Sequence, residues 1–256
     1  MSSKVAIVTG ASQGIGRSTA IRLARDFDSI VLVARNRANL EETAIEVKKA
    51  GAASLVIDAD LAEAGAAQQV VDQTLAAFGR IDALLNIAGA VPQIDVLEMT
   101  DEQWDNGLAL KLHGARRLTI AAWPALKASS GAVVLMSGNS ALFPKAPYAA
   151  VGTINAAIVA LAKAFSDRGI ADGVQVNTVL PGPVMTGRRR SYLEHWAPLH
   201  NMTVEEATAQ FPVEAGIARY GTPEEIAALM AFIVSPEARW MTGSTLRMDG
   251  GEVKSI

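Results

Sequence analysis

Three glycines follow the first apolar segment of the chain at a spacing that suits phosphate binding. Residues 4–9 predict a buried strand, and Gly10, Gly14 and Gly16 come directly after it. The first glycine permits a tight turn, the second lets the backbone approach a ligand, and the third lets a helix pack close to the strand. That helix would present free N–H groups and a positive dipole end to an anion. The pattern therefore indicates a dinucleotide site, and an incidental tight turn is the alternative.

A second chemical feature follows the next predicted strand, at Arg35. NAD-binding sites usually carry a carboxylate about 20 residues after the glycines, where it holds the ribose 2′-hydroxyl. Ala34 occupies that position, so nothing there would repel a 2′-phosphate, and the Arg35 guanidinium could bind one through two hydrogen bonds. NADP(H) is therefore expected in preference to NAD(H). The alternative is that Arg35 and Arg37 are solvated charges at a helix start.

The elements that must position these residues alternate between apolar strands and amphipathic helices. This alternation predicts an α/β, doubly wound Rossmann fold, with a parallel seven-stranded sheet and helices on both faces. Such a sheet binds ligands at the carboxyl ends of its strands. The expected strands are 4–9, 29–34, 54–57, 82–86, 131–137, 173–179 and 244–248, and the expected helices are 15–26, 38–50, 63–78, 101–127, 150–168 and 223–234.

We expect one domain over residues 1–256, with one long irregular segment at about 183–213. This segment follows the sixth strand and lies at the same carboxyl-end edge, where long loops usually act as lids or binding loops. It contains Arg188, Arg189 and Arg190, which favour an anionic small-molecule substrate such as a carboxylate. A solvated basic face is the alternative.

Composition excludes several other classes of protein. Half of the residues are apolar and 19% are charged, which argues against disorder, and a net charge of −3 argues against nucleic acid as a partner. The chain has no cysteine, which excludes thiolate metal sites and fits a cytoplasmic location, and its three histidines show no metal-ligand spacing. No apolar run approaches roughly 18 residues, so no membrane span is expected.

Four further motifs follow the ends of later predicted strands. They are Asp60-Leu61, Asn86-Ile87-Ala88-Gly89, Pro181-Gly182-Pro183-Val184-Met185-Thr186 and Asp249-Gly250-Gly251. Together with residues 9–16, they resemble the short-chain dehydrogenase/reductase family over essentially the whole chain. Ile87 stands where the family more often has a second Asn. The resemblance implies an oxidoreductase acting on a small carbonyl or alcohol, and assembly as a homotetramer or homodimer.

The resemblance also implies roles for the cofactor-binding residues. Asp60 would contact the adenine, the turn at 86–89 would brace the central sheet beneath the cofactor, and the segment at 181–186 would hold the nicotinamide carboxamide. The full expected cofactor set is Gly10, Ser12, Gly14, Ile15, Gly16, Arg35, Asp60, Leu61, Asn86, Ala88, Gly89, Pro181, Gly182, Val184 and Thr186.

The catalytic positions depart from the family pattern. Family members reduce a carbonyl with a Tyr that donates the proton, a Lys four residues later, a Ser about thirteen residues earlier, and an Asn on the preceding helix. Counting back thirty residues from Pro181, the usual family spacing, places the Tyr position at Val151 and the Ser position at Gly138. The Lys position is then Asn155. The Asn of the family follows a Trp-Asp pattern, and here Trp104-Asp105 and the five residues after them lead to Lys111.

The Lys and Asn of the family pattern are thus exchanged in this chain. In family members the two positions face each other across a water, so a Lys111 ammonium could reach the same region and lower the pKa of a nearby phenol, Tyr148 first. Tyr148 lies three residues before Val151, and Ser140 lies two residues past Gly138. The expected catalytic set is Lys111, Asn155, Tyr148 and Ser140.

Three functions are compatible with this altered site. We expect an NADP(H)-dependent oxidoreductase with a non-standard active site. One alternative is a catalytically inactive NADP-binding homologue that acts through a partner. Another is an enzyme of the same fold that performs non-redox, lyase-type chemistry, with Lys111 as an activated nucleophile or base.

Overall fold

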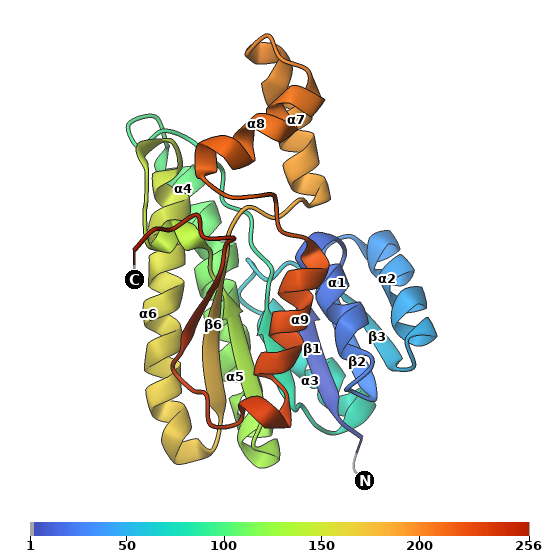
Figure 1. The fold of residues 1–256 in the computed structure, drawn as a ribbon. Coiled ribbons are helices and arrows are strands. Elements are labelled where there is room, and N and C mark those ends of the chain that lie inside the picture. The colour runs from blue at the N-terminus through green and yellow to red at the C-terminus, as the bar shows by residue number, and fades with distance from the viewer. Residues whose placement is uncertain (1–2, 256) are drawn as a thin grey trace.

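Seven parallel strands form the sheet in a computed structural model that describes residues 3–255 (Figure 1). Their spatial order is β3-β2-β1-β4-β5-β6-β7, so the crossovers change direction between β1 and β4. A doubly wound sheet opens a crevice for ligands at such a point. The strands are β1 (Val5–Thr9), β2 (Ser29–Ala34), β3 (Ala53–Asp58), β4 (Ala83–Asn86), β5 (Ala132–Met136), β6 (Gln175–Pro181) and β7 (Thr245–Met248).

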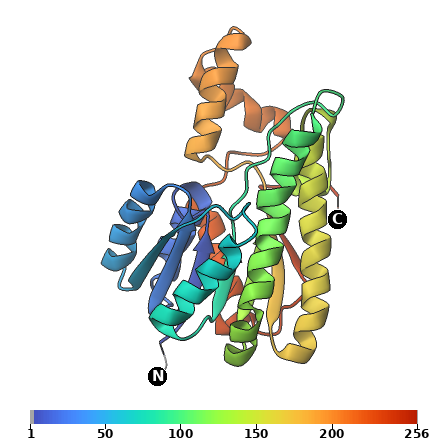
Figure 2. The ribbon, with the colours of Figure 1, turned by 180° about the vertical axis from the view of Figure 1, so that it is seen from behind.

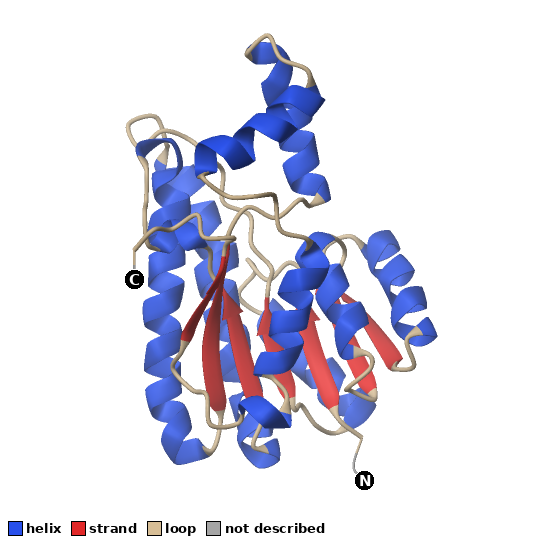
Figure 3. Cartoon of the chain, viewed as in Figure 1, coloured by secondary structure: helices blue, strands red, loops and turns tan. Residues whose placement is uncertain are grey.

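Helices cover both faces of the sheet, as Figures 2 and 3 show. Successive residues of a strand point to opposite faces, so β1 contributes Ala6 and Val8 to one core and Val5 and Ile7 to the other. The longer helices are α1 (Gly14–Leu23), α2 (Arg37–Lys49), α3 (Ala66–Phe78), α4 (Asp101–Gly107), α5 (Ala115–Ser129), α6 (Ala149–Asp172), α7 (Gly187–Leu199), α8 (Val204–Ala215) and α9 (Pro223–Ile233).

The segment that joins α4 to α5 is a π-helical stretch, η1 (Leu108–Gly114). The sequence predicts one helix over 101–127, and the path is indeed continuous, but the hydrogen-bond pattern widens at its centre. Such π-helical stretches are rare and often mark functional sites. Lys111 lies in the middle of this one.

The expectation of an irregular segment at about 183–213 is wrong, because most of it is helical. Helices α7 and α8 extend beyond the carboxyl-end edge of the sheet (Figure 1). They pack on a small apolar cluster that includes Leu193, Ala197 and Ala207. Pro198 and Pro212 lie inside these helices and obscure the helical pattern in the sequence.

Helix α6 corrects the expectation that no apolar run approaches membrane-spanning length. The stretch Ala146–Asp172 contains a window of mean hydropathy 1.5, which is long and apolar enough to cross a membrane by composition alone. Core helices of globular proteins pass the same test. This helix packs on β5 and β6, and Ile154, Ile158 and Ala162 are buried there.

Candidate active site

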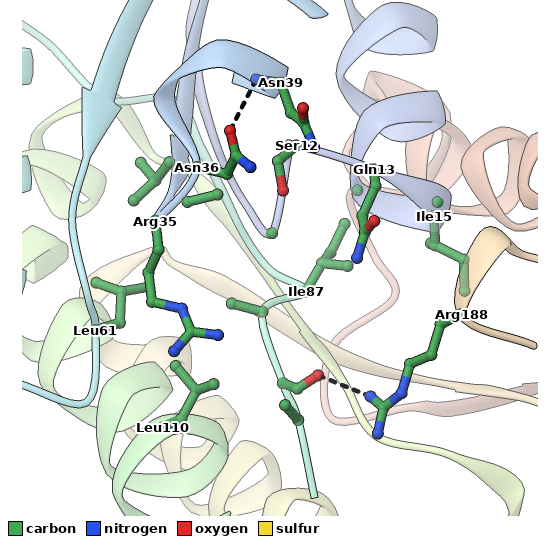
Figure 4. A pocket seen from close by; sticks show the side chains of 18 of the residues that line it. Ser12, Gln13, Ile15, Arg35, Asn36, Asn39, Leu61, Ile87, Leu110 and Arg188 are labelled. Carbon is green, nitrogen blue, oxygen red and sulfur yellow. Dashed lines mark hydrogen bonds between the residues drawn. The ribbon is translucent and has the colours of Figure 1, made fainter. Parts of the chain in front are cut away.

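A first cavity lies at the carboxyl ends of β1, β2 and β4 and has a volume of about 990 Å³ (Figure 4). Its floor is the glycine turn between β1 and α1. Gly10 has φ +67°, a conformation that disfavours other residues. A Cβ on Gly16 would lie 2.1 Å from the Gly10 carbonyl oxygen, so only glycine allows α1 to start this close to the strand. The first turn of α1 thus presents its backbone to the cavity.

Thr9 ties the glycine turn to the end of β4. Its hydroxyl oxygen accepts hydrogen bonds from the backbone N–H groups of Ile87 and Ala88, each at 2.9 Å. Asn86 points away from the cavity and donates to the Thr119 hydroxyl at 3.1 Å. The turn at 86–89 therefore braces two adjacent strand ends beneath the cavity, and Asn86 is a structural residue of that brace.

Two arginines follow β2, and their surroundings differ. Arg37 is held by Asp58 at 2.8 Å and by Glu41 at 3.0 Å. Arg35 makes only a longer contact with Asp60, at 3.6 Å, and 68% of its side chain is exposed. Figure 4 shows Arg35 beside Leu61 on one side of the cavity. Arg35 therefore has guanidinium donors available for an anion.

Most of the expected cofactor residues line this first cavity. Asn86 and Pro181 line neither cavity, and Gly182 and Val184 line the second one instead. Several polar residues of the lining were not expected from the sequence. Some of them could have been predicted, because they are direct neighbours of expected cofactor residues in the sequence. The expected residues in the lining are Gly10, Ser12, Gly14, Ile15, Gly16, Arg35, Asp60, Leu61, Ala88, Gly89 and Thr186, and the missed polar ones are Gln13, Asn36, Arg37, Asn39 and Arg188.

The second cavity, of about 680 Å³, lies between the start of α6 and helices α7 and α8. One wall consists of the residues at the altered catalytic positions and their neighbours. The opposite wall is mainly aromatic. The first wall includes Gly138, Ser140, Tyr148, Val151 and Asn155, and the second includes Arg189, Tyr192, Trp196 and Phe211.

Lys111, Asn155 and Ser140 form one hydrogen-bonded chain. The Lys111 ammonium donates to Asn155 Oδ1 at 2.5 Å and, more weakly, to the Ser137 carbonyl at 3.4 Å. Asn155 Nδ2 in turn donates to Ser140 Oγ at 2.8 Å. The two exchanged side chains, one placed by counting back from Pro181 and the other from the Trp104-Asp105 pattern, are therefore in direct contact.

The exchange also explains the glycine at the Ser position. A Cβ on Gly138 would lie 2.7 Å from Asn155 Nδ2, so a serine there would collide with the asparagine. Another serine hydroxyl, that of Ser140, lies two residues later in the short 3₁₀ turn η2 (Asn139–Ala141). Val151 provides no hydroxyl at all to the cavity it lines.

Burial perturbs the Lys111 ammonium. The residue keeps some exposed surface, but its charged end is enclosed by protein. Burial first, and then the nearby Arg188 guanidinium, lower the pKa of Lys111 to about 8. The stem of the side chain packs on Gly89, where a Cβ would lie 3.0 Å from Lys111 Cδ. The ammonium thus lies between the two cavities.

The pKa of Tyr148 is not lowered by Lys111, contrary to the expectation from the sequence. Burial, and then the charge of Glu252, raise the pKa of the Tyr148 phenol. The structure shows no hydrogen bond between Tyr148 and Lys111, Asn155 or Ser140, although Tyr148 lines the same cavity as the last two. The expected lowering of the Tyr148 pKa is therefore wrong, and this phenol stays protonated at neutral pH.

The directions of the hydrogen bonds determine what the chain of three side chains can do. An ammonium only donates, so Asn155 Oδ1 must accept and Asn155 Nδ2 must point at Ser140. Ser140 Oγ accepts that bond, which leaves its own proton free to donate into the cavity that it lines. The arrangement presents a directed hydroxyl donor to a ligand.

The fold, the glycine turn and the position of this site define a dinucleotide-binding protein of the doubly wound class. The family described as enoyl-(acyl carrier protein) reductase matches residues 10–252. A short-chain reductase, NovJ of Streptomyces niveus, is 32% identical over 96% of this chain and 93% of its own. The chain therefore belongs to the short-chain dehydrogenase/reductase family, as its motifs predict.

Solved structures agree with this assignment. L-sorbose reductase from Gluconobacter frateurii, in complex with NADPH and L-sorbose, is 29% identical, with a TM-score of 0.95 over 100% of this chain and 98% of that one. YwfH, an NADPH-dependent reductase of bacilysin biosynthesis, is 28% identical, with a TM-score of 0.92 over 100% of both chains. The cofactor named for both neighbours is the one that Ala34 and Arg35 predict, and both are reductases.

Proposed function

We propose that this protein is an NADP(H)-dependent reductase of a small carbonyl compound, working through a rebuilt proton-donor site. One observation carries the proposal. The Ser140 hydroxyl oxygen accepts a hydrogen bond from Asn155, which is oriented by the Lys111 ammonium, so the hydroxyl proton is free to donate into the second cavity. The first cavity adjoins this site, since Gly89 of its lining packs on the Lys111 stem.

The first cavity fits an NADP molecule. The glycine turn and the start of α1 suit a pyrophosphate, and Arg35 offers free donors to a ribose 2′-phosphate. Thr186 lies next to Gly14 in the lining of the cavity, and a Cβ on Gly14 would lie 3.4 Å from Thr186 Cγ2. When bound, the nicotinamide supplies a hydride to the carbonyl carbon of the substrate.

The residues of this chain then have to position the carbonyl and protonate its oxygen. Ser140 donates a hydrogen bond to that oxygen and polarises the carbonyl. The proton itself must come from a group that can release one, and an amide does not pass a proton on readily. Tyr148 lines the same cavity and, as a phenol, carries a proton at neutral pH, so we assign it as the donor.

The test is NADPH consumption and alcohol formation over a panel of small ketones and aldehydes. Parent protein should reduce at least one compound, and Tyr148→Phe should lower kcat without changing the dissociation constant of NADPH. Parent protein that binds NADPH tightly but reduces no compound, and oxidises none of the matching alcohols with NADP, would contradict the proposal.

A cofactor-binding protein without turnover is the second candidate. Val151, which lines the cavity at the usual Tyr position without a hydroxyl, favours it. Lyase-type chemistry through Lys111 has less support, because the ammonium is enclosed, donates to Asn155 and lines neither cavity. The homo-oligomeric state, the cytoplasmic location and the limits of the single domain stay predictions from the sequence.

A further inference from the structure

The three consecutive arginines at the start of α7 point in different directions. Arg188 reaches the first cavity and donates to the Val91 carbonyl at 3.2 Å. Arg190 is exposed. Arg189 alone lines the second cavity, next to the altered catalytic residues. The basic cluster seen in the sequence therefore contributes one guanidinium to the substrate side.

Aromatic rings hold Arg189 in place. Its guanidinium lies 4.1 Å from the centre of the Phe211 ring, 5.2 Å from that of Tyr192 and 5.5 Å from that of Tyr220. Such contacts attract the cation and orient its plane while leaving its N–H groups unused. The only hydrogen bond given by these groups within residues 3–255 is a long one, 3.5 Å, to the Tyr220 hydroxyl.

No carboxylate among residues 3–255 forms an ion pair with Arg189, although Glu214 and Glu252 line the same cavity and Glu252 is close enough for the Arg189 charge to act on its carboxyl. The Glu252 carboxylate accepts instead from the Asn139 amide, and Glu214 accepts from Gln210. Lys145 also lines the cavity. Burying guanidinium donors without acceptors is costly, so an acceptor from a ligand would relieve the cost.

The same charges select the kind of anion. Glu214 and Glu252 would repel a dianion such as a phosphate more strongly than a single carboxylate. A carboxylate also matches the planar fork of a guanidinium through two parallel hydrogen bonds. The cavity that Arg189 and Ser140 both line also has apolar and aromatic surface, including Val151, that suits a short hydrocarbon spacer.

We propose that Arg189 binds a carboxylate of the substrate, so that this protein acts on short oxo acids in preference to neutral carbonyls. The proposal rests on the proposed reductase function for the carbonyl end of the molecule. The carboxylate end would contact Arg189, and the carbonyl oxygen would accept from Ser140. Arg189 thereby determines specificity.

Binding can be tested without turnover by using protein loaded with NADP⁺, which cannot donate a hydride. The probes are 2-oxobutanoate, 4-oxopentanoate and 5-oxohexanoate, each compared with its methyl ester by calorimetry. We expect at least one acid to bind about tenfold or more tightly than its ester, as for a charge-assisted pair. Arg189→Gln should remove this preference, and Arg190→Gln, which removes the neighbouring exposed charge, should keep it.

Two outcomes overturn the inference: parent protein that binds no acid better than its ester, or Arg189→Gln protein that keeps the preference. Arg189→Lys replaces Arg189→Gln if the latter fails to fold, and it should lose most of the preference because it lacks the planar fork. Acid binding that depends on Arg189, without any NADPH turnover, would support the carboxylate site and refute the reductase function. Equal turnover of acids and esters would support the reductase function and refute the carboxylate site.

Discussion

The first cavity is built largely from backbone, whereas the second is built from side chains. In the first, the glycine turn and the Thr9-braced strand end provide N–H groups whose positions follow from the fold. In the second, Lys111, Asn155 and Ser140 depend on one another for orientation. A backbone site tolerates little change in its glycines, while a side-chain network can be rebuilt by compensating substitutions. This contrast explains how the cofactor motifs persist beside an altered catalytic set.

The largest effect is expected for Ser140→Ala, which tests whether the second cavity works separately from the first. If Ser140 is the carbonyl-binding donor, its loss should lower kcat by about 10²–10⁴, the range typical of a lost catalytic hydrogen-bonding group. The dissociation constant of NADPH should stay the same, because Ser140 does not line the first cavity. Steady-state kinetics and calorimetry measure the two quantities. A reduced NADPH affinity with unchanged kcat would break the separation between the cavities.

A smaller effect, confined to the first cavity, is expected for Arg35→Ala. Loss of a charge-assisted contact with the 2′-phosphate should cost about 1.5–3 kcal/mol of NADPH binding and leave NADH binding nearly unchanged. Arg37→Ala is the matched control, because Arg37 is occupied by Asp58 and Glu41. Calorimetry with NADPH and with NADH measures the two changes in binding free energy. An equal loss of NADPH and NADH affinity would show that Arg35 does not recognise the phosphate.

The turnover rate is expected to change a few-fold with pH. The Lys111 ammonium orients Asn155 as long as it is protonated, and its pKa is lowered to about 8. Activity should therefore fall as pH rises through about 8, and this fall should be missing in Lys111→Met, at whatever residual rate remains. Rates measured from about pH 6 to about pH 10 test it. A parent profile that is flat through pH 8 would contradict the role given to the ammonium.

The smallest effect concerns stability. The pKa of Lys111 is about 8 in the folded protein and 10.5 in an unperturbed lysine, so the unfolded chain binds more protons between these two values. The free energy of unfolding of the parent should therefore rise with pH across this window, relative to that of Lys111→Met. Below the window, the difference between the two free energies should not change with pH. Urea unfolding at about pH 7 and about pH 10 measures the difference. A relative fall with rising pH would mean that the lysine is not destabilised by burial.

The two cavities also differ in how far the sequence could predict them. The strand pattern and the glycine turn predicted the sheet and the first cavity, because backbone geometry follows from local residue types. Counting back from Pro181 placed Asn155, and the Trp104-Asp105 pattern placed Lys111, at positions that prove to be in contact. The count from Pro181 succeeded because α6 leads almost directly into β6, which leaves little room for insertion.

The remaining features depended on tertiary packing. The π-helical stretch around Lys111 is a change of hydrogen-bond register within one helical pattern, and no residue type marks it. Pro198 and Pro212 obscured α7 and α8, although Thr203 and Glu206 form a capping box that signals the start of α8. Two of the three rings around Arg189, those of Phe211 and Tyr220, come from later segments, so three adjacent arginines looked equivalent in the sequence.

The central claim is that the exchanged Lys111–Asn155 pair is part of the working site. The most direct measurement is the NADPH dissociation constant of Lys111→Met, compared with the parent and with the exposed control Lys48→Met. The account predicts about tenfold weaker NADPH binding for Lys111→Met, because a positive charge enclosed beside the first cavity is lost and NADPH is an anion, together with loss of turnover, because Asn155 loses the donor that orients it. The control should match the parent. Parent-like affinity and parent-like turnover in Lys111→Met would contradict the account and make the exchange a coincidence.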